Sequence, residues 1–253
     1  MKYKIPFELS LIEREYGVRI LYAGEAGVRA WGFASSESKH DVRFIYLPAP
    51  KEAATVADAH GFIDKPVAPG LTLRGFDLRR TLDLLFSSHA PLLDWLRSGS
   101  VYAEDARFTT QLRGLAGRFF DAERSFIQYL NLANRIQREH LKNGTPPPGK
   151  YLEAVRAILA ARYIARLRIP PPVELTALVD ATVDDVMLRF AIGDLILRAR
   201  TGDNQQPTDT AAGSDIVKSF LTEELLRLTT MSAESPSAEE KITPLPFRYL
   251  QVA

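Results

Sequence analysis

Alternating apolar positions predict three β-strands in the first part of the chain. Residues 17–23 and 41–47 alternate β-branched or aromatic side chains with polar ones, and residues 70–77 form a shorter candidate. A glycine-punctuated turn and a short helix over residues 24–33 separate the first two. Strand patterns are therefore expected only in the first third of the chain.

From Leu78 onward the apolar spacing becomes helical. The pattern predicts helices over residues 78–90, 104–120, 121–141, 150–167, 182–200 and 215–229. Proline- and glycine-rich breakers over 143–149 and 170–172 separate the later helices. Thr182 and Asp185 have the spacing of a capping box at a helix start.

This order of elements predicts an α+β fold with two main parts. We expect a small mixed sheet with helices over residues 1–103 and an α-helical domain over 104–230. A linker and C-terminal tail follow over 231–253. The tail regains apolar residues over 242–252, so we expect it to pack on the helical domain or across a cleft.

Composition narrows the class of protein more than it identifies a function. The chain has 253 residues, a net charge of +1 and no cysteine, which excludes disulfides and thiolate metal sites. Its four histidines lack metal-binding spacing. No signal peptide or membrane-spanning run is evident, so we expect a cytoplasmic protein without a membrane partner. The sequence does not determine the oligomeric state.

Candidate chemistry is concentrated in residues 24–43, GEAGVRAWGFASSESKHDVR. A strand runs into a glycine turn and short helix, and a second strand then opens with an acidic residue. Glycine lets the backbone approach a triphosphate, and helix N-terminal amides bind its charge. Carboxylates at positions i and i+2 of a strand point the same way and can share two Mg²⁺ ions. This layout is typical of polymerase-beta-type nucleotidyltransferases.

Longer segments make the resemblance more specific. GEAGVRAWGF, HDVRFIY, RGFDLRRTLDLL, HAPLLDWLRSGSVY and KYLEAVRAILAARYI with PPPVEL resemble the YcgL-type (RlaP) nucleotidyltransferase family over residues 12–200. This family of the DNA polymerase beta superfamily is associated with RNA repair. The resemblance implies Mg²⁺ and a nucleoside triphosphate as cofactors. It also implies an RNA end or a protein hydroxyl as acceptor.

The resemblance also assigns roles to individual residues. Gly27 corresponds to the phosphate-loop glycine, Asp41 to the second Asp of an Asp-x-Asp pair and Asp77 to a third carboxylate. Asp41 and Asp77 are thus the expected catalytic and metal-binding residues. Their structural alternatives are a strand-start Asp and the N-cap of the helix from Leu78.

Further nucleotide contacts are implied around the glycine turn and on the helical domain. Arg29 is expected to line or brace the loop with Glu25 and Trp31. Lys150 and Arg156 lie where the family keeps basic residues and could face the cleft. Ordinary helix positions are the structural alternative for both.

Two positions depart from the family pattern. At the position after Gly27, where the family has a serine, this chain has Val28, which has no hydroxyl to offer a phosphate. At the position of the family's first metal-binding Asp this chain has Lys39, which places a cation at the metal position. Two like charges near 4 Å repel by about 4 kcal/mol at an effective dielectric near 20.

Three functional hypotheses follow. The chain is an enzyme that transfers a nucleotidyl group with activity weakened or lost through Val28 and Lys39, or a pseudoenzyme that binds nucleotide, RNA or a partner protein, or an engineered inactive variant. In the first two, cofactors range from Mg²⁺ with a nucleoside triphosphate to none. The motif spacing predicts that Lys39, Asp41 and Asp77 converge near the Gly27 turn.

Overall fold

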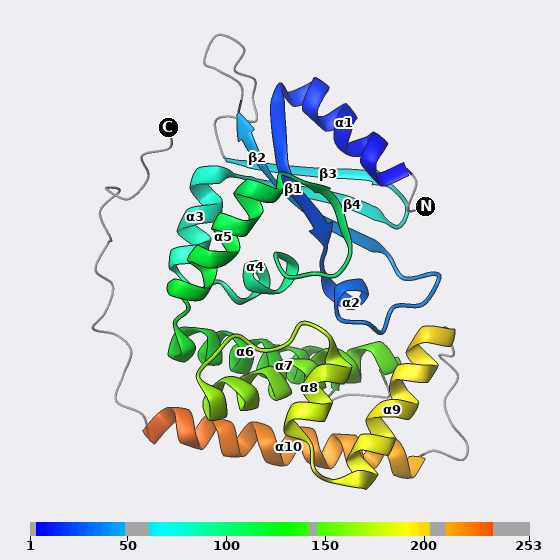
Figure 1. Ribbon diagram of the computed structural model, residues 1–253. Helices are drawn as coiled ribbons and strands as arrows, with labels where there is room; N and C mark the ends of the chain where they lie inside the picture. The colour runs from blue at the N-terminus through cyan, green and yellow to red at the C-terminus, as the bar shows by residue number, and fades with distance from the viewer. Residues whose placement is uncertain (1–3, 49–60, 142–145, 203–210, 235–253) are drawn as a thin grey trace.

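The protein consists of a sheet-containing part stacked on a helical part (Figure 1). The structure is a computed structural model that describes residues 4–48, 61–141, 146–202 and 211–234. The apolar segment expected to dock at the C-terminus lies outside these described residues. The fold is α+β, as the pattern of strands followed by helices predicted.

The sheet has five strands in the order β3-β4-β2-β1-β5. They are β1 (Val18–Glu25), β2 (His40–Pro48), β3 (Phe62–Ala68), β4 (Leu71–Asp77) and β5 (Val101–Glu104). Strands β2 and β4 pair in parallel, and the other neighbours pair antiparallel. The three predicted strands are confirmed, whereas β3 and β5 were not predicted.

Alternation along β2 divides the sheet into two faces. Val42, Phe44 and Tyr46 are fully buried and pack with Leu9 and Ile12 of α1 (Ile5–Tyr16). Residues between them on β2 point to the other face, as the two-residue period of a strand requires. That second face carries Asp41 and is the one that meets the candidate site.

Three helices cover the second face of the sheet. They are α3 (Leu78–Phe86), α4 (Ala90–Trp95) and α5 (Ala106–Arg118). Leu112 of α5 belongs to the same buried cluster as Tyr22 and Ile45 of the sheet. Helix α5 therefore packs with the sheet.

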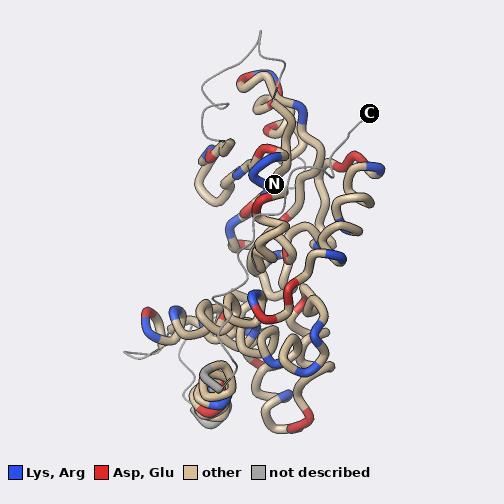
Figure 2. Tube along the Cα trace, turned by 90° about the vertical axis from the view of Figure 1, so that its left-hand side faces the viewer, with Lys and Arg blue, Asp and Glu red and all other residues tan. Residues whose placement is uncertain are grey.

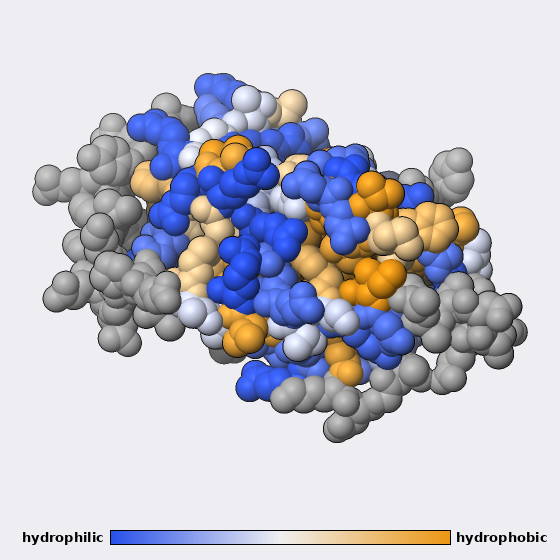
Figure 3. Space-filling view, turned by 90° about the horizontal axis from the view of Figure 1, so that it is seen from below, coloured by the Kyte–Doolittle hydropathy of each residue, from blue (hydrophilic) through white to orange (hydrophobic). Residues whose placement is uncertain are grey.

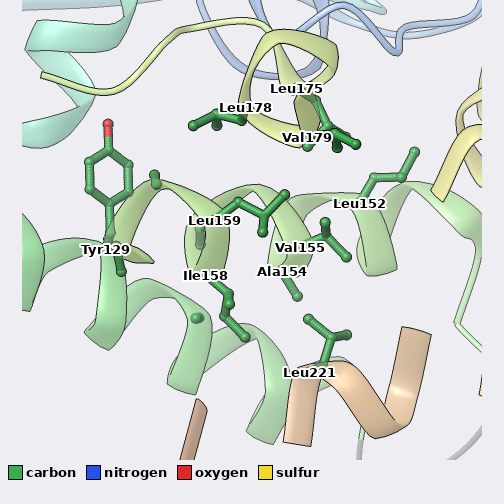
Figure 4. Close-up of a cluster of buried hydrophobic side chains, with 14 of the residues drawn as sticks. Tyr129, Leu152, Ala154, Val155, Ile158, Leu159, Leu175, Leu178, Val179 and Leu221 are labelled. Atoms are coloured by element: carbon green, nitrogen blue, oxygen red, sulfur yellow. The ribbon is translucent and has the colours of Figure 1, made fainter. Parts of the chain in front are cut away.

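The helical part is organised around one buried helix. Its elements are α6 (Ala122–Ile136), a π-helical turn η4 (Gln137–Leu141), α7 (Pro148–Leu167), α8 (Leu175–Thr182), α9 (Val186–Thr201) and α10 (Ala211–Glu234). Figure 4 shows α7 side chains such as Leu159 and Val155 lying between Leu178 of α8 and Leu221 of α10. Because α7 is buried on most sides and packs along α6 and η4, it helps to position the helical wall of the cleft.

One helix start differs from the expectation. Thr182 is the last residue of α8, and its hydroxyl donates to the Leu178 carbonyl at 2.6 Å. Asp185 alone caps α9 by accepting from the Met187 and Leu188 amides. The predicted capping box is wrong, because a separate short helix already uses Thr182.

The surface carries both signs of charge along most of the described chain (Figure 2). Seen from below, the helical part mixes hydrophobic with hydrophilic side chains (Figure 3). Val186, Phe190 and Leu197 of α9 are among the exposed hydrophobic residues. No helix in the described ranges is long and apolar enough to cross a membrane.

Candidate functional site

A cleft of about 920 Å³ lies where the second face of the sheet meets α4 and α6. Its walls come from the turn after β1, from β2 and β4, and from α3, α4, α6 and η4. The lining residues are Ala26, Gly27, Ala30, Trp31, Asp41, Arg43, Phe76, Leu84, His89, Ala90, Pro91, Asp94, Trp95, Gln128, Tyr129, Asn131, Leu132, Asn134, Arg135 and Arg138. The cleft therefore takes residues from both parts of the chain.

The Gly27 turn has the conformation that its motif predicted. Gly27 has φ +62°, a left-handed conformation that favours glycine, and a Cβ there would meet nothing within 4 Å. The Ala26 amide donates to the Asp41 carbonyl at 2.8 Å, which ties the turn to the start of β2. The turn that begins the four-residue helix α2 (Gly27–Ala30) thus opens onto the cleft beside Asp41.

Val28 and Arg29 are engaged away from the cleft. Val28 packs against the hydrophobic core of the helical part. The Arg29 guanidinium donates to the carbonyls of Ser36 and Ser38 and, at 3.3 Å, to that of Lys39. Arg29 therefore braces the loop between α2 and β2, and a direct nucleotide contact by either residue remains a prediction.

Asp41 and Lys39 lie in different surroundings, inside and outside the cleft, although they are only two residues apart. Asp41 lines the cleft, and its Oδ2 accepts from the Arg43 guanidinium at 2.8 Å. Its Oδ1 is buried and has no partner among the described residues. Lys39 precedes the first residue of β2, is exposed and does not line the cleft.

Asp77 lies far from Asp41. Parallel pairing sets Thr72 of β4 opposite Asp41, whereas Asp77 pairs with Tyr46, roughly 16 Å farther along the strand. The Asp77 carboxylate caps α3 by accepting from the Arg80 amide at 2.6 Å. The expected convergence is therefore wrong, and the N-cap alternative for Asp77 is confirmed.

The two basic residues expected from α7 differ sharply. Lys150 pairs with Glu153 at 2.9 Å and does not line the cleft. Arg156 is 1% exposed, pairs with Asp94 at 2.9 Å and lies over the Trp31 ring. Burial acts to lower the pKa of Arg156, but the Asp94 carboxylate and Tyr129 together more than offset it, so this pKa is raised. Arg156 therefore joins the two parts of the chain behind the cleft wall.

Asp94 is engaged through its Oδ1 atom within this buried group. Besides Arg156, it accepts a hydrogen bond from the Tyr129 hydroxyl at 2.7 Å. Burial and then the Asp94 charge raise the pKa of Tyr129, so this hydroxyl stays protonated. Asp94 is consequently held as the counter-ion of Arg156.

Several cleft residues were missed in the sequence. Arg43 could have been identified, because position i+2 from Asp41 must face the same side of the strand. His89, Arg135 and Arg138 lie on segments that reach the cleft only through the packing of α4 and α6. No local sequence signal marks them.

A second hollow of about 210 Å³ lies behind the Gly27 turn and is lined by Arg29, Ser100 and other residues. There the buried Glu25 carboxylate accepts from Tyr102 at 2.7 Å and contacts the His40 ring. Burial and the bond to Glu25 raise the pKa of Tyr102. These three side chains, Glu25, His40 and Tyr102, connect β1, β2 and β5 close to the start of β2.

The residues present do not fit the two Mg²⁺ ions that the motif implies. A two-metal site needs several carboxylates within reach of both ions. The described residues contain no group of three or more His, Cys, Asp or Glu side chains able to hold a metal. In the cleft, Asp41 is paired with Arg43, and Asp94 is paired with Arg156.

Comparisons with known proteins place the chain in a family. The family model for RlaP, described as "RNA repair pathway DNA polymerase beta family", matches residues 1–246. The uncharacterized protein YcgL of Bacillus subtilis (strain 168) is 35% identical over 243 residues, covering 96% of this chain and 92% of the relative.

A solved structure shows a weaker likeness. The nucleotidyltransferase-like protein from Exiguobacterium sibiricum 255-15 is 13% identical and matches with a TM-score of 0.35. The match covers 90% of this chain and 74% of that one, but so low a score carries no argument. The family model and the Bacillus relative together show that the chain belongs to the RlaP family of DNA polymerase beta-type nucleotidyltransferases.

Proposed function

We propose that this nucleotidyltransferase-family protein binds a nucleotide in its cleft and that its transfer activity is weakened or lost. The activity concerned is transfer of a nucleotidyl group from a nucleoside triphosphate to an RNA end or a protein hydroxyl. One observation carries the proposal: of the expected metal ligands, only Asp41 faces the cleft, and Arg43 already neutralises it.

The form of the cleft supports nucleotide binding. Ligand pockets typically measure about 300–1,000 Å³ and combine apolar walls with a few polar groups. Here the half-buried Trp31 and Phe76 supply aromatic surface, and the Gly27 turn supplies a close backbone approach. These features match a base and a phosphate chain respectively.

The surroundings of Asp41 support the loss of transfer. Two Mg²⁺ ions stabilise the attacking and leaving oxygens only when carboxylates hold both ions in place. The residue opposite Asp41 on β4 is Thr72, and the residue two positions before Asp41 is Lys39. Neither supplies a second carboxylate. The hydroxyl expected at Val28 is replaced by a side chain that packs into the helical core.

A transfer assay with radioactive nucleoside triphosphates, Mg²⁺ and both RNA and protein acceptors tests this proposal. The wild-type chain should bind nucleotide but label neither acceptor above background. A restored variant combines Thr72→Asp, which adds a carboxylate directly opposite Asp41, with Lys39→Asp and Val28→Ser, which return the family residues at the two departed positions. It should gain Mg²⁺-dependent labelling.

Each half of the proposal can fail separately. Robust labelling by the wild-type chain would overturn the loss of transfer. Absence of nucleotide binding by the wild-type chain, together with a melting curve that added nucleotide does not shift, would overturn the binding role.

A further inference from the structure

Two arginines reach the cleft from the helical part of the chain. Arg135 lies in the last turn of α6, and Arg138 lies three residues later in the π-helical turn η4. Both line the cleft and are exposed. Neither has an ion-pair or hydrogen-bond partner within the described ranges. Because both line the same cleft, the two guanidinium groups serve one region.

Arg43 supplies a third guanidinium from the opposite wall. Its Nη2 donates to Asp41, while its Nε is buried and lacks a partner among the described residues. A buried donor without a partner is unfavourable, so an acceptor at this atom would stabilise the cleft. The arginine is therefore only partly used by its own aspartate.

The balance of charge in the cleft favours an anion. Three arginines line it, against Asp41 and Asp94. Asp94 is already neutralised by Arg156. Burial and then the charges of Arg43 and Arg80 lower the pKa of His89, which agrees with a positive potential at this wall.

The family resemblance implies Mg²⁺ together with a nucleoside triphosphate, but the described residues do not assemble a metal site. Arginine binds phosphate oxygens through paired, charge-assisted hydrogen bonds and can neutralise them without a metal. Resting on the proposed nucleotide-binding function, we propose that the cleft binds the phosphates of a nucleoside triphosphate without a divalent cation, through Arg43, Arg135 and Arg138.

The role of the metal can be tested by calorimetric titration of ATP and of inorganic tripolyphosphate, each in EDTA and in excess Mg²⁺. The intact chain should bind both ligands in EDTA at least as tightly as in Mg²⁺, because the ion screens the charge that the arginines recognise. Adenosine, which has no phosphate, should bind far more weakly. Added salt should weaken binding of both phosphate ligands.

The residues can be tested with single variants that keep the polar side chain. Arg135→Gln and Arg138→Gln should each weaken ATP binding in EDTA by about tenfold, the effect of losing one charge-assisted contact. Arg118→Gln, an exposed arginine on α5 outside the cleft lining, is the matched control and should leave affinity unchanged. Melting curves establish that each variant is folded.

The outcomes separate this inference from the proposed function. Binding that appears only with Mg²⁺, or equal affinities for the two variants and the control, would overturn the arginine-based site but leave nucleotide binding intact. Absence of binding in both EDTA and Mg²⁺ would overturn both.

Discussion

At the scale of single residues, two basic side chains on one helix have different structural roles. Lys150 and Arg156 share α7, yet Lys150 forms a partly exposed pair within its own helix, whereas Arg156 is buried against Asp94. The sequence placed both as candidate nucleotide ligands, because spacing along a helix does not report how far each position is buried. Burial decides which of the two is structural.

This difference predicts a contrast in stability. Arg156→Met leaves Asp94 charged and buried without its partner, so the free energy of unfolding should fall by about 3–5 kcal/mol. Lys150→Met, the control on the same helix, should lower it by no more than about 1 kcal/mol. Urea unfolding of both variants measures the difference, and equal losses would contradict the role given to Arg156.

At the scale of elements, predictability followed the strength of the local pattern. Strands β1, β2 and β4 were predicted because each alternates long apolar side chains. In β3 only Ile63 is buried, and β5 has four residues, so neither presents a clear period. Helix α1 was also missed although Ile5, Leu9 and Ile12 have helical spacing. That helix was within reach of the sequence.

The short helix α4 depends on a cap that titrates. His89 Nδ1 accepts from the Leu92 amide at 3.4 Å, a bond that requires the neutral imidazole. Burial, followed by the charges of Arg43 and Arg80, lowers the pKa of His89 below 6.5. The folded state thus binds this proton less readily than the unfolded state.

A pH dependence of stability follows from this cap. The stability that neutral His89 contributes should be present above about pH 6.5 and be lost as pH falls below it, by up to about 1.4 kcal/mol per pH unit until the folded pKa is reached. His89→Asn keeps a capping acceptor that does not titrate. Urea unfolding at about pH 7.5 and about pH 5.5 should show the smaller acid loss in the variant. An identical loss in both proteins would contradict this assignment.

At the scale of the whole molecule, the fold could be predicted further than the site. The family segments placed Gly27 and Asp41 at the same cleft, as the structure has them. They also placed Asp77 there, because a sequence does not specify the register of two parallel strands. The pairing of Asp77 with Tyr46 moves that carboxylate to the far end of β4. Arg135 entered the cleft only through packing between the two parts of the chain.

A metal-binding cleft and an arginine-based phosphate site predict opposite effects of replacing Asp41. If Asp41 binds a metal that carries the triphosphate, Asp41→Asn should weaken nucleotide binding severely. If Asp41 instead competes with phosphate for the Arg43 guanidinium, the same change should strengthen it. Asparagine keeps the size and an acceptor oxygen, so the change removes mainly the negative charge.

The most direct test is therefore the affinity of Asp41→Asn for ATP in EDTA and in Mg²⁺, measured calorimetrically beside the wild-type chain. Removing one neighbouring negative charge should tighten binding severalfold in EDTA, on the order of 1 kcal/mol or less at this partly exposed position. The gain should shrink as salt is added. Weaker binding by the variant in either titration, with an unchanged melting curve, would contradict an arginine-based phosphate site. A loss confined to the titration in Mg²⁺ would restore Asp41 as a metal ligand.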